Sequence, residues 1–323
     1  MPTAISGGSR IRTNIPAQNA YNALLSANNN IAEKQLRLST GKRINSAADD
    51  VSGYITSRSL TARNGSLRAA LNSAGDAKNV TSIAMDALDN INDLLTSIKD
   101  AAAQASSGAL GTDEKVALAK GAYRLSQQIQ FIVDSTVFAG QQLLQGAFSG
   151  DWTVGYYANN TLLTIGINLA TDNNSDFNIS SGKGFTVNAT NEASYPSGAS
   201  IPITDFAGVS SLNLESLNSV NSSNLGIFDD DQVEVTITSL ATALNNVNKV
   251  ASYLGGIHVR LSSQEDLLKS QITNYSAAIS RIEDADVATE QLDLIKSQFL
   301  QQASLVSLAQ ANQNPQSFLQ LFR

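Results

Sequence analysis

The sequence predicts a mainly α-helical protein, in which long antiparallel helices from both chain termini form a coiled-coil rod, with a small β-hairpin and β-rich middle region. Two observations lead to this fold. Apolar residues recur every three or four positions in several separate segments, a spacing that places them on one face of a helix. This pattern stops near Gly140 and returns near Leu240, and much of the sequence between is rich in Ser, Asn and Gly.

The N-terminal half contains three predicted helices. In the first, the apolar positions are Ala17, Ala20, Leu24, Ala27, Ile31 and Leu38, and Lys34 interrupts them. In the second, they are Ala84, Leu88, Ile91, Leu95, Ile98, Ala102 and Ala105. We expect the third helix to run from Thr112 to about Val133, because the Thr112 hydroxyl can cap it and Asp113 and Glu114 favour the positive end of its dipole.

The longest apolar series lies in the C-terminal half, and at 1.5 Å per residue it predicts a helix roughly 60 Å long. Its members are Leu240, Leu244, Val247, Ala251, Leu254, His258, Leu261, Glu265, Leu268, Ile272, Tyr275, Ile279 and Ile282. Such a length indicates rod-like pairing of helices. Gly255 and Gly256 are its weak point, since each costs about 1 kcal/mol relative to alanine.

A final helical segment continues the same spacing toward the C-terminus. It contains Leu292, Ile295, Phe299, Val306 and Ala309, with Gln302 as a polar interruption. The two ends of the chain therefore carry matching apolar series. Because an amphipathic helix loses its apolar stripe to water when it is alone, we expect these ends to pack against each other or against a neighbouring molecule.

The middle of the chain has a different pattern. Residues 152–169 predict two strands joined by a turn at Ala158–Asn160, since apolar and aromatic runs flank turn-forming residues. Residues 171–229 are rich in Ser, Asn and Gly and contain only short strand-like pieces. We expect this segment to be a short, surface-exposed insertion.

Composition argues against several function classes. Charged residues make up 15% of the chain, and 28 acidic against 21 basic residues give a net charge of −7. This balance disfavours nucleic acid and anionic membranes as partners, since both need clustered positive charge. With no cysteine and a single histidine, His258, we expect no catalytic residue, no cofactor and no metal site. His258 is interpreted as a polar residue tolerated in the apolar series.

The first residues do not resemble a secretory signal, because no apolar stretch lies between a basic flank and a small-residue cleavage site. No run of apolar residues approaches the length of a membrane span. If the protein acts outside the cell, we expect it to leave by a route that keeps its N-terminus.

Three stretches resemble the terminal signatures of one protein family. They are LRLSTGKRINSAADDVSGY (36–54), SRIEDADVATE (280–290) and QQASLVSLAQANQNPQSFLQLFR (301–323). In this order they are similar to bacterial flagellins, the subunits of the flagellar filament used for swimming. The first nine residues extend beyond the usual start of that family, which lies close to the element Ile11–Asn14 in this chain.

The resemblance implies three regions. Residues 1–42 and 286–323 would form the filament core, residues 43–170 and 230–285 a helical shell, and residues 171–229 the variable outer surface. The expected subunit contacts in the core are Ala20, Leu24, Ala27, Ile31, Leu38, Leu292, Ile295, Phe299, Val306, Leu319 and Leu321. The chain would then polymerise with copies of itself.

A segment from Arg43 to Gly53 would connect core and shell. Its acidic pair Asp49 and Asp50 could suggest catalysis, but carboxylate spacing without a cleft is weak evidence for it. Helix-terminal electrostatics or ion pairing within or between subunits is the preferred interpretation, with Arg43 and Arg281 as candidate partners. The same interpretation applies to the acidic residues Glu283, Asp284 and Asp286.

The resemblance also implies an extracellular, secreted protein. Export would use the type III apparatus of the flagellum, and the partners would be an export chaperone, the cap protein and the hook-associated proteins. Surface glycans on the middle region stay an open alternative. In many flagellins an arginine and a leucine of the shell helix contact a vertebrate innate-immune receptor. Ser97 and Ala101 occupy those positions here, so we expect weak recognition.

Two other function classes are alternatives to a filament subunit. A hook-associated junction protein of the same axis would share the terminal coiled-coil pattern, but the full C-terminal motif argues against it. An enzyme is the third alternative. Some flagellins carry a metallopeptidase in the middle region, and that activity needs two histidines where this chain has one.

Overall fold

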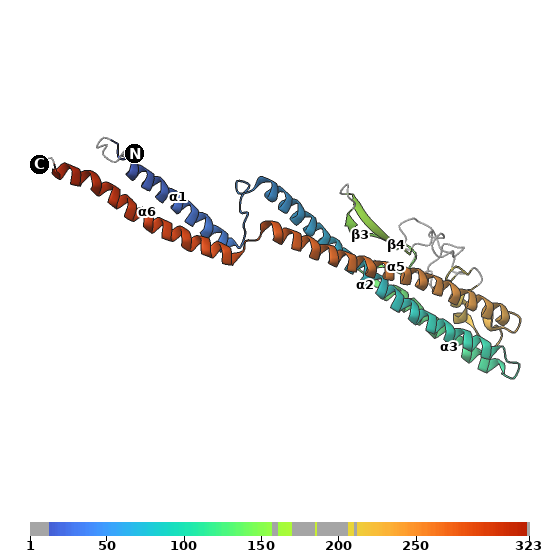
Figure 1. The fold of residues 1–323 in the computed structure, drawn as a ribbon. Coiled ribbons are helices and arrows are strands. Elements are labelled where there is room, and N and C mark those ends of the chain that lie inside the picture. The colour runs from blue at the N-terminus through green and yellow to red at the C-terminus, as the bar shows by residue number, and fades with distance from the viewer. Residues whose placement is uncertain (1–12, 157–160, 170–184, 186–205, 210–211, 322–323) are drawn as a thin grey trace. The chain divides into compact units, whose positions relative to one another are not determined.

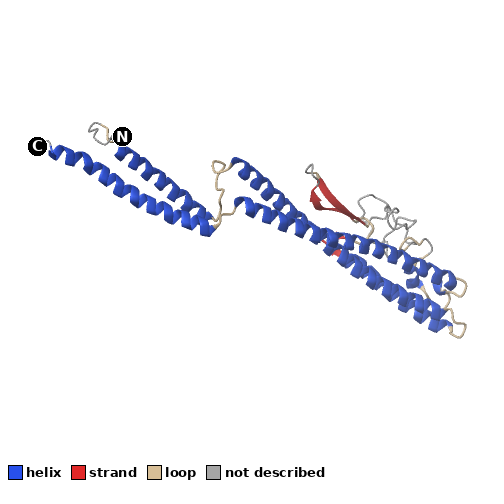
Figure 2. Ribbon diagram, in the orientation of Figure 1, coloured by secondary structure: helices blue, strands red, loops and turns tan. Residues whose placement is uncertain are grey.

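The computed structural model describes residues 13–156, 161–169, 185, 206–209 and 212–321, with side chains up to Gln313. Its described part is dominated by long helices, as Figure 2 shows, and the only sheets within it are two small antiparallel pairs. The predicted mainly helical fold with a small β region is therefore confirmed. The helices are α1 (Ile15–Thr40), α2 (Val51–Ala105), α3 (Thr112–Ser135), α5 (Val233–Glu283) and α6 (Val287–Leu321) (Figure 1).

The strands follow α3 directly. A tight hairpin pairs β1 (Val137–Phe138) with β2 (Gln141–Gln142), and its turn residues Ala139 and Gly140 have φ values of 50° and 82°. Positive φ at both turn positions matches the twist of a two-residue hairpin, and Gly140 adopts it without strain. A longer hairpin pairs β3 (Ser149–Tyr156) with β4 (Leu162–Asn168), as predicted, and the predicted turn at Ala158–Asn160 lies outside the described residues.

The chain divides into two compact units. Unit 1 contains the described residues up to Gly65 and from Ile272 onward, and unit 2 contains Ser66–Gln271. The expected boundary between core and shell, at residues 42 and 286, does not coincide with this division. The first turns of α2 and the last turns of α5 belong to the same unit as the terminal helices, and within it Asn64 of α2 donates a hydrogen bond to Ser276 of α5 (2.9 Å).

Unit 2 is held by an apolar interface in which α2 and α5 lie side by side. All seven predicted apolar residues of α2 are buried, and Leu88, Ile91, Leu95 and Ile98 are 0% exposed. On α5 the residues Leu240, Val247, Leu254, Leu261 and Leu268 are buried in the same spacing. Full burial of a leucine or isoleucine side chain contributes roughly 1.5–3 kcal/mol, so this interface is the main source of stability in unit 2.

Polar side chains also bridge α2 and α5. The Thr81 hydroxyl donates to the carbonyl of Lys78 (2.8 Å), so it is free to accept from Nδ1–H of His258, 3.1 Å away. His258 is half-buried and hydrogen-bonded within the helix pair, in line with its interpretation as a tolerated polar residue. Gly255 and Gly256 do not interrupt α5, which is continuous through both positions.

α3 begins at Thr112, as predicted, but Gly111 is its N-cap and no side-chain hydrogen bond caps this end. The expected capping role of Thr112 is therefore wrong. The helix ends at Ser135, two residues beyond the expected end, where the Thr136 hydroxyl donates to the carbonyl of Ile132.

The prediction of a surface-exposed insertion over residues 171–229 is wrong for its described C-terminal part. Two short 3-10 helices, η2 (Leu214–Ser219) and η3 (Gly226–Phe228), pack into unit 2, and η2 contacts α3. The buried residues here are Phe206, Leu212, Leu214, Leu217, Val220 and Phe228. They cover apolar surface that α3 and α5 would otherwise expose to water.

Candidate self-association surface

The terminal helices α1 and α6 lie side by side in unit 1 (Figure 1) and contact each other along most of α1. At one end, Asn14 caps α1 by accepting from the amide of Ala17 (3.2 Å) and donates to the carbonyl of Ala311 (2.8 Å). Near the middle, Gln301 donates to Asn28 (2.7 Å).

Small side chains bring the two helices together. The buried residues of the contact include Ala20, Ala27 and Ala311, each at most 8% exposed, and the small polar residue Ser297. Small residues allow helix backbones to approach closely, but they bury little apolar area. The pair is therefore held by less hydrophobic stabilisation than the interface of α2 and α5.

The predicted contact residues divide into two groups. Ala20 and Ala27 are buried between the helices, and Leu24, Ile31 and Leu38 are half-buried. On α6, by contrast, Leu292, Ile295, Phe299 and Val306 are 69%, 56%, 71% and 69% exposed. These α6 residues therefore do not pack on α1 within one chain, since α6 turns smaller and more polar residues toward α1, and the expected contact with a neighbouring molecule stays a prediction. The side chains of Leu319 and Leu321 lie outside the described part.

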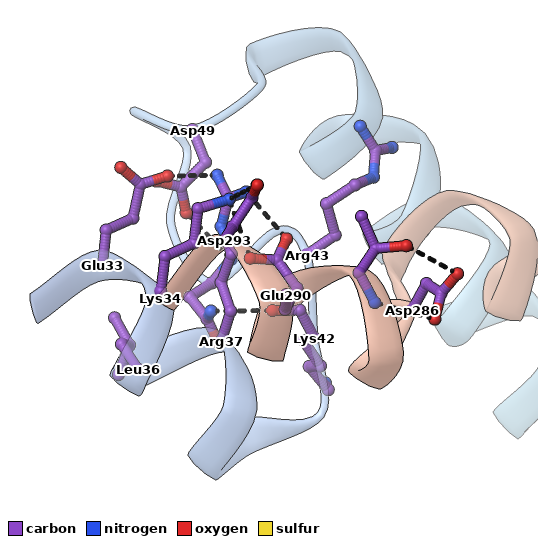
Figure 3. Close-up of polar contacts among 12 residues, drawn as sticks. Glu33, Lys34, Leu36, Arg37, Lys42, Arg43, Asp49, Asp286, Glu290 and Asp293 are labelled. Atoms are coloured by element: carbon purple, nitrogen blue, oxygen red, sulfur yellow. Dashed lines mark hydrogen bonds and ion pairs between the residues drawn. The ribbon is translucent and has the colours of Figure 1, made fainter. Parts of the chain in front are cut away.

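An ion-pair cluster closes the other end of the helix pair, as Figure 3 shows. The Glu290 carboxylate, 9% exposed, pairs with Nζ of Lys34 at 2.8 Å and with Nη1 of Arg37 at 3.2 Å. Lys34 also contacts Asp293 at 3.1 Å, and Arg37 pairs with Glu33. These pairs fix the register of α1 against α6, because the nearly buried carboxylate has its partners only in this alignment.

Burial and ion pairing act in opposite directions on Glu290. Burial raises the pKa of its carboxyl, but the hydrogen bonds and charges of Lys34 and Arg37 outweigh burial, so the pKa lies below its ordinary value. The hydrogen bond to Glu290 raises the pKa of the Lys34 ammonium. Both groups are therefore charged over the whole neutral range.

Residues 41–43, which follow α1, form hydrogen bonds and an ion pair with the junction between α5 and α6. The amide of Arg43 donates to the carbonyl of Glu283 (2.6 Å), and the amide of Ala285 donates to the carbonyl of Gly41 (3.0 Å). Lys42 forms an ion pair with the buried Glu283 at 2.6 Å. The guanidinium of Arg43 donates to the carbonyl of Ile282 (2.7 Å), and among the described residues it pairs with no carboxylate.

The other acidic candidates mostly stabilise local turns. Asp50 accepts from the amide of Gly53 at the start of α2, and Asp286 accepts from the amides of Ala288 and Thr289 at the start of α6. Asp49 accepts from the amides of Asn45 and Ser46. These hydrogen bonds hold the pKa of Asp49 and the pKa of Asp286 below their ordinary values, in Asp286 chiefly through Thr289.

Arg281 does not pair with these acids in the described part of the chain. It is exposed, and the partner of Glu283 is Lys42, which was not among the expected partners. Asp284 is exposed and accepts from the Ser280 hydroxyl. Any role of Arg281 as an ion-pair partner would therefore be toward another molecule.

Sequence reasoning missed three residues of the cluster, Lys34, Arg37 and Glu290, and it also missed Lys42, the partner of Glu283. In the sequence pattern Lys34 is only an interruption of the apolar series. A basic residue inside one apolar series and an acidic residue at the start of its partner were the available signal.

The two receptor-motif positions lie on α2. Ser97 is exposed and its hydroxyl donates to the carbonyl of Asp93 (3.0 Å), and Ala101 is half-buried. Within the described ranges, no cluster of His, Cys, Asp and Glu could hold a metal ion. No described helix is long and apolar enough to cross a membrane.

Comparison with known proteins identifies both helical halves. Residues 11–149 match the bacterial flagellin N-terminal helical region, and residues 219–322 match the bacterial flagellin C-terminal helical region. The chain is 30% identical over 321 residues to a flagellin of Bacillus subtilis, an alignment that covers 97% of this chain and 100% of the relative.

Further relatives are also flagellins that align over nearly their full length. A flagellin of Halalkalibacterium halodurans is 29% identical over 314 residues, covering 97% of this chain and 99% of that protein. Polar flagellin F of Vibrio parahaemolyticus is 26% identical over 377 residues, covering 96% and 98%. With both terminal regions matched and relatives aligned over nearly their full length, this chain belongs to the bacterial flagellin family.

Proposed function

We propose that the paired terminal helices α1 and α6 are the polymerisation element of this flagellin, and that the exposed apolar residues of α6 bury against further copies of the chain. Flagellins are structural proteins that form the extracellular flagellar filament, so the chain is a filament subunit and not an enzyme. The proposal concerns which residues carry the assembly.

One observation carries the proposal: the apolar residues of α6 are spread around the helix, and α1 covers only one of its faces. Leu292, Phe299 and Val306 are each at least 69% exposed. Further exposed apolar residues of this helix are Val287, Ile295, Leu300 and Leu305. Exposed apolar surface of this extent marks a contact with other molecules, so we infer that these α6 residues are covered by neighbouring subunits.

The energetics agree with assembly-driven ordering. Each residue that folds loses about 1–2 kcal/mol of backbone conformational entropy. Burial of the small residues between α1 and α6 offsets little of this entropy cost. Each large apolar side chain of α6 would contribute roughly 1.5–3 kcal/mol of stabilisation when fully buried. We infer that residues 1–42 and 286–323 form the filament core, and that residues 43–170 and 230–285 surround it.

Finer parts of the function rest on family membership alone. We infer export through the flagellar type III apparatus, with an export chaperone, the cap protein and the hook-associated proteins as partners. We further propose surface glycans on the middle region and, because Ser97 and Ala101 stand where the family has an arginine and a leucine, weak recognition by the immune receptor. Secretion of the full chain by a strain that lacks its own flagellin, compared between export-competent and export-deficient backgrounds, tests the export route.

The central test uses two valines of equal exposure. Val306 on α6 and Val259 on α5 are both 69% exposed, so Val306→Asp and Val259→Asp make the same change at equally accessible sites. We expect Val306→Asp to raise the critical concentration for seeded polymerisation at least about tenfold, because it places a charge in an apolar contact. Critical concentration is measured by sedimentation, with electron microscopy to identify filaments.

The Val259→Asp control and the helicity of both monomers show whether a defect of Val306→Asp lies in assembly or in folding. Val259→Asp should polymerise close to wild type, and both monomers should keep wild-type helicity by circular dichroism. Filaments of Val306→Asp that form as readily as those of the Val259→Asp control would contradict the proposed role of α6.

A further inference from the structure

Two outer faces of unit 2 carry opposite charge. On α2, the side opposite the buried apolar interface presents Asp86, Asp89, Asp93 and Asp100, all exposed, which we call the acidic stripe. On α3, the side opposite its buried residues presents Lys120 and Arg124, with the exposed Phe131 one heptad beyond Arg124; we call this the basic face. In the described part of the chain, none of these six charged side chains forms an ion pair within its own molecule.

We propose that the basic face of α3 in one subunit docks on the acidic stripe of α2 in a neighbouring subunit, which gives unit 2 a charge-coded contact of its own. The inference rests on the proposed function, since it assumes that the chain polymerises. It adds a second interface, distinct from the terminal helices, and commits to a second copy of this chain as the occupant.

Helix direction supports this pairing. α3 follows α2 after the short connection 106–111 and turns back along it (Figure 1), so the two helices are antiparallel within one chain. In a helical filament without two-fold axes every copy points the same way along the axis. The α3 helix of one copy therefore meets the α2 helix of its neighbour in antiparallel orientation.

The spacing of the residues then selects a register. Lys120 and Arg124 are four residues apart, about 6 Å along the helix, as are Asp93 and Asp89. When Lys120 lies opposite Asp93, the antiparallel register places Arg124 opposite Asp89. Both ion pairs form together.

The same register matches the remaining positions nearby. Gln127 falls opposite Asp86, whose carboxylate can accept from the amide, and Phe131 falls beside Ile83. Phe131 is 64% exposed and Ile83 is 38% exposed, so each gains cover. At the far end, Asp113 falls opposite Asp100 beside Lys99, which limits the charge match to the stretch from Asp86 to Asp93.

The two faces lie on different helices of the same unit, so the contact is head-to-tail. Such an interface does not close on itself as a two-fold dimer would, and each subunit has one face left for the next copy. This property fits a growing filament. Like charges placed opposite one another in such an interface strongly disfavour association.

The experiment exchanges charges between the faces. Variant A is Lys120→Glu/Arg124→Glu, variant B is Asp89→Lys/Asp93→Lys, and the matched control is Lys249→Glu/Arg260→Glu, which makes the same charge change at exposed positions of α5. Polymerisation is seeded with wild-type filament fragments at low ionic strength, since salt near 1 M screens charges beyond about 3 Å. Monomer helicity is checked for each variant.

We expect A and B alone to have critical concentrations at least about tenfold above wild type. An equal mixture of A and B should polymerise within about threefold of wild type, because each acidic α3 then finds a basic α2 and each basic α3 an acidic α2. The Lys249→Glu/Arg260→Glu control should behave as wild type. Restoration by mixing separates a specific contact from damage to the fold.

Two results would overturn the inference. Wild-type behaviour of A and B alone would show that the two faces do not meet, and a mixture as defective as its components would show that the charges do not face each other. Either result, with wild-type filaments forming normally, leaves the role of the terminal helices intact. Failure of the wild-type chain itself to polymerise would contradict the proposed function and this contact together.

Discussion

The two long helix pairs of this flagellin are built from different residues. The α2–α5 pair in unit 2 buries leucine and isoleucine side chains almost completely, whereas the α1–α6 pair in unit 1 buries mainly alanine, serine and a carboxylate. α6 instead exposes its large apolar residues. The difference shows that a repeated apolar spacing can serve two purposes: it stabilises the subunit in unit 2, and we propose that it stabilises the polymer in unit 1.

The largest expected effect tests this contrast with one substitution made at two leucines. Leu88→Ala in α2 removes a side chain that is 0% exposed, so it should lower the free energy of unfolding of the monomer by about 2–5 kcal/mol. Leu292→Ala in α6, at 69% exposure, should change it by no more than about 0.5 kcal/mol. Denaturant unfolding followed by circular dichroism measures both.

In filaments, unlike in the monomer, Leu292→Ala should have a clear effect on stability. In filaments, Leu292→Ala should lower the dissociation temperature, because its contacts are expected between subunits. Equal loss of monomer stability in both variants would remove the distinction between the two helix pairs.

The ion-pair cluster gives the next largest effect. Glu290→Gln leaves Lys34 and Arg37 facing a neutral group in a nearly buried site, which should destabilise the α1–α6 pair by about 2 kcal/mol. Asp293→Asn is the matched control, since the Asp293 side chain is 46% exposed and contacts only the edge of the cluster. The dissociation temperature of filaments at neutral pH should fall clearly for Glu290→Gln and little for Asp293→Asn.

The same residue predicts a dependence on pH. The folded pKa of Glu290 lies below its ordinary value, so its stabilisation is complete above the unfolded pKa of about 4.3 and is lost as pH falls through the folded pKa. Wild-type filaments should therefore lose this part of their stability only at pH values below about 4. In Glu290→Gln that part of the acid dependence should be absent, and an unchanged acid profile would argue against the cluster.

A smaller effect is expected at the start of α1. Asn14→Ala removes both the cap of Ala17 and the hydrogen bond to Ala311, and should cost about 1 kcal/mol in the α1–α6 pair. Asn14→Asp keeps the capping oxygen but loses the donor to Ala311. Filament dissociation temperatures should rank wild type above Asn14→Asp and Asn14→Asp above Asn14→Ala, while the monomer unfolding of unit 2 stays unchanged.

The smallest expected effect is a gain in unit 2. Gly256→Ala should stabilise α5 by about 0.4–1 kcal/mol, because a Cβ there meets nothing within 4 Å and alanine favours a helix. Gly53→Ala is the contrasting change in unit 1, where a Cβ would lie 2.5 Å from Asp50 Oδ2 and 2.6 Å from Ile44 Cδ1. Thermal unfolding should show opposite signs, and a loss of stability in Gly256→Ala would mean that α5 needs flexibility at this point.

Sequence reasoning was most accurate where one helix face is fully covered inside the chain. The α2 series from Ala84 to Ala105 and the α5 series from Leu240 to Leu268 needed only local spacing to identify, because large apolar residues there pack on one partner. The β3–β4 hairpin was also predictable, since its alternating strands flank turn-forming residues.

Sequence reasoning failed where small or polar residues form the contact between two elements. The α6 face that meets α1 contains Ser297, Gln301 and Ala311, and none of these carries a strong hydrophobic signal. The burial of Leu212, Leu214 and Leu217 was missed because the surrounding Ser and Asn residues suggested an exposed loop. The Glu290 cluster joins residues about 250 positions apart, and no local pattern pairs them.

The sequence by itself determined the helical class, the apolar series of α2 and α5 and the family, because these depend on residue spacing and on motifs read along the chain. The tertiary structure decided which face of α6 contacts α1, which carboxylate forms ion pairs with Lys34 and Arg37, and which apolar side chains stay exposed. Those outcomes depend on the rotation of one helix against another, and a rotation is fixed only when all the small, polar and charged contacts of both helices are satisfied together.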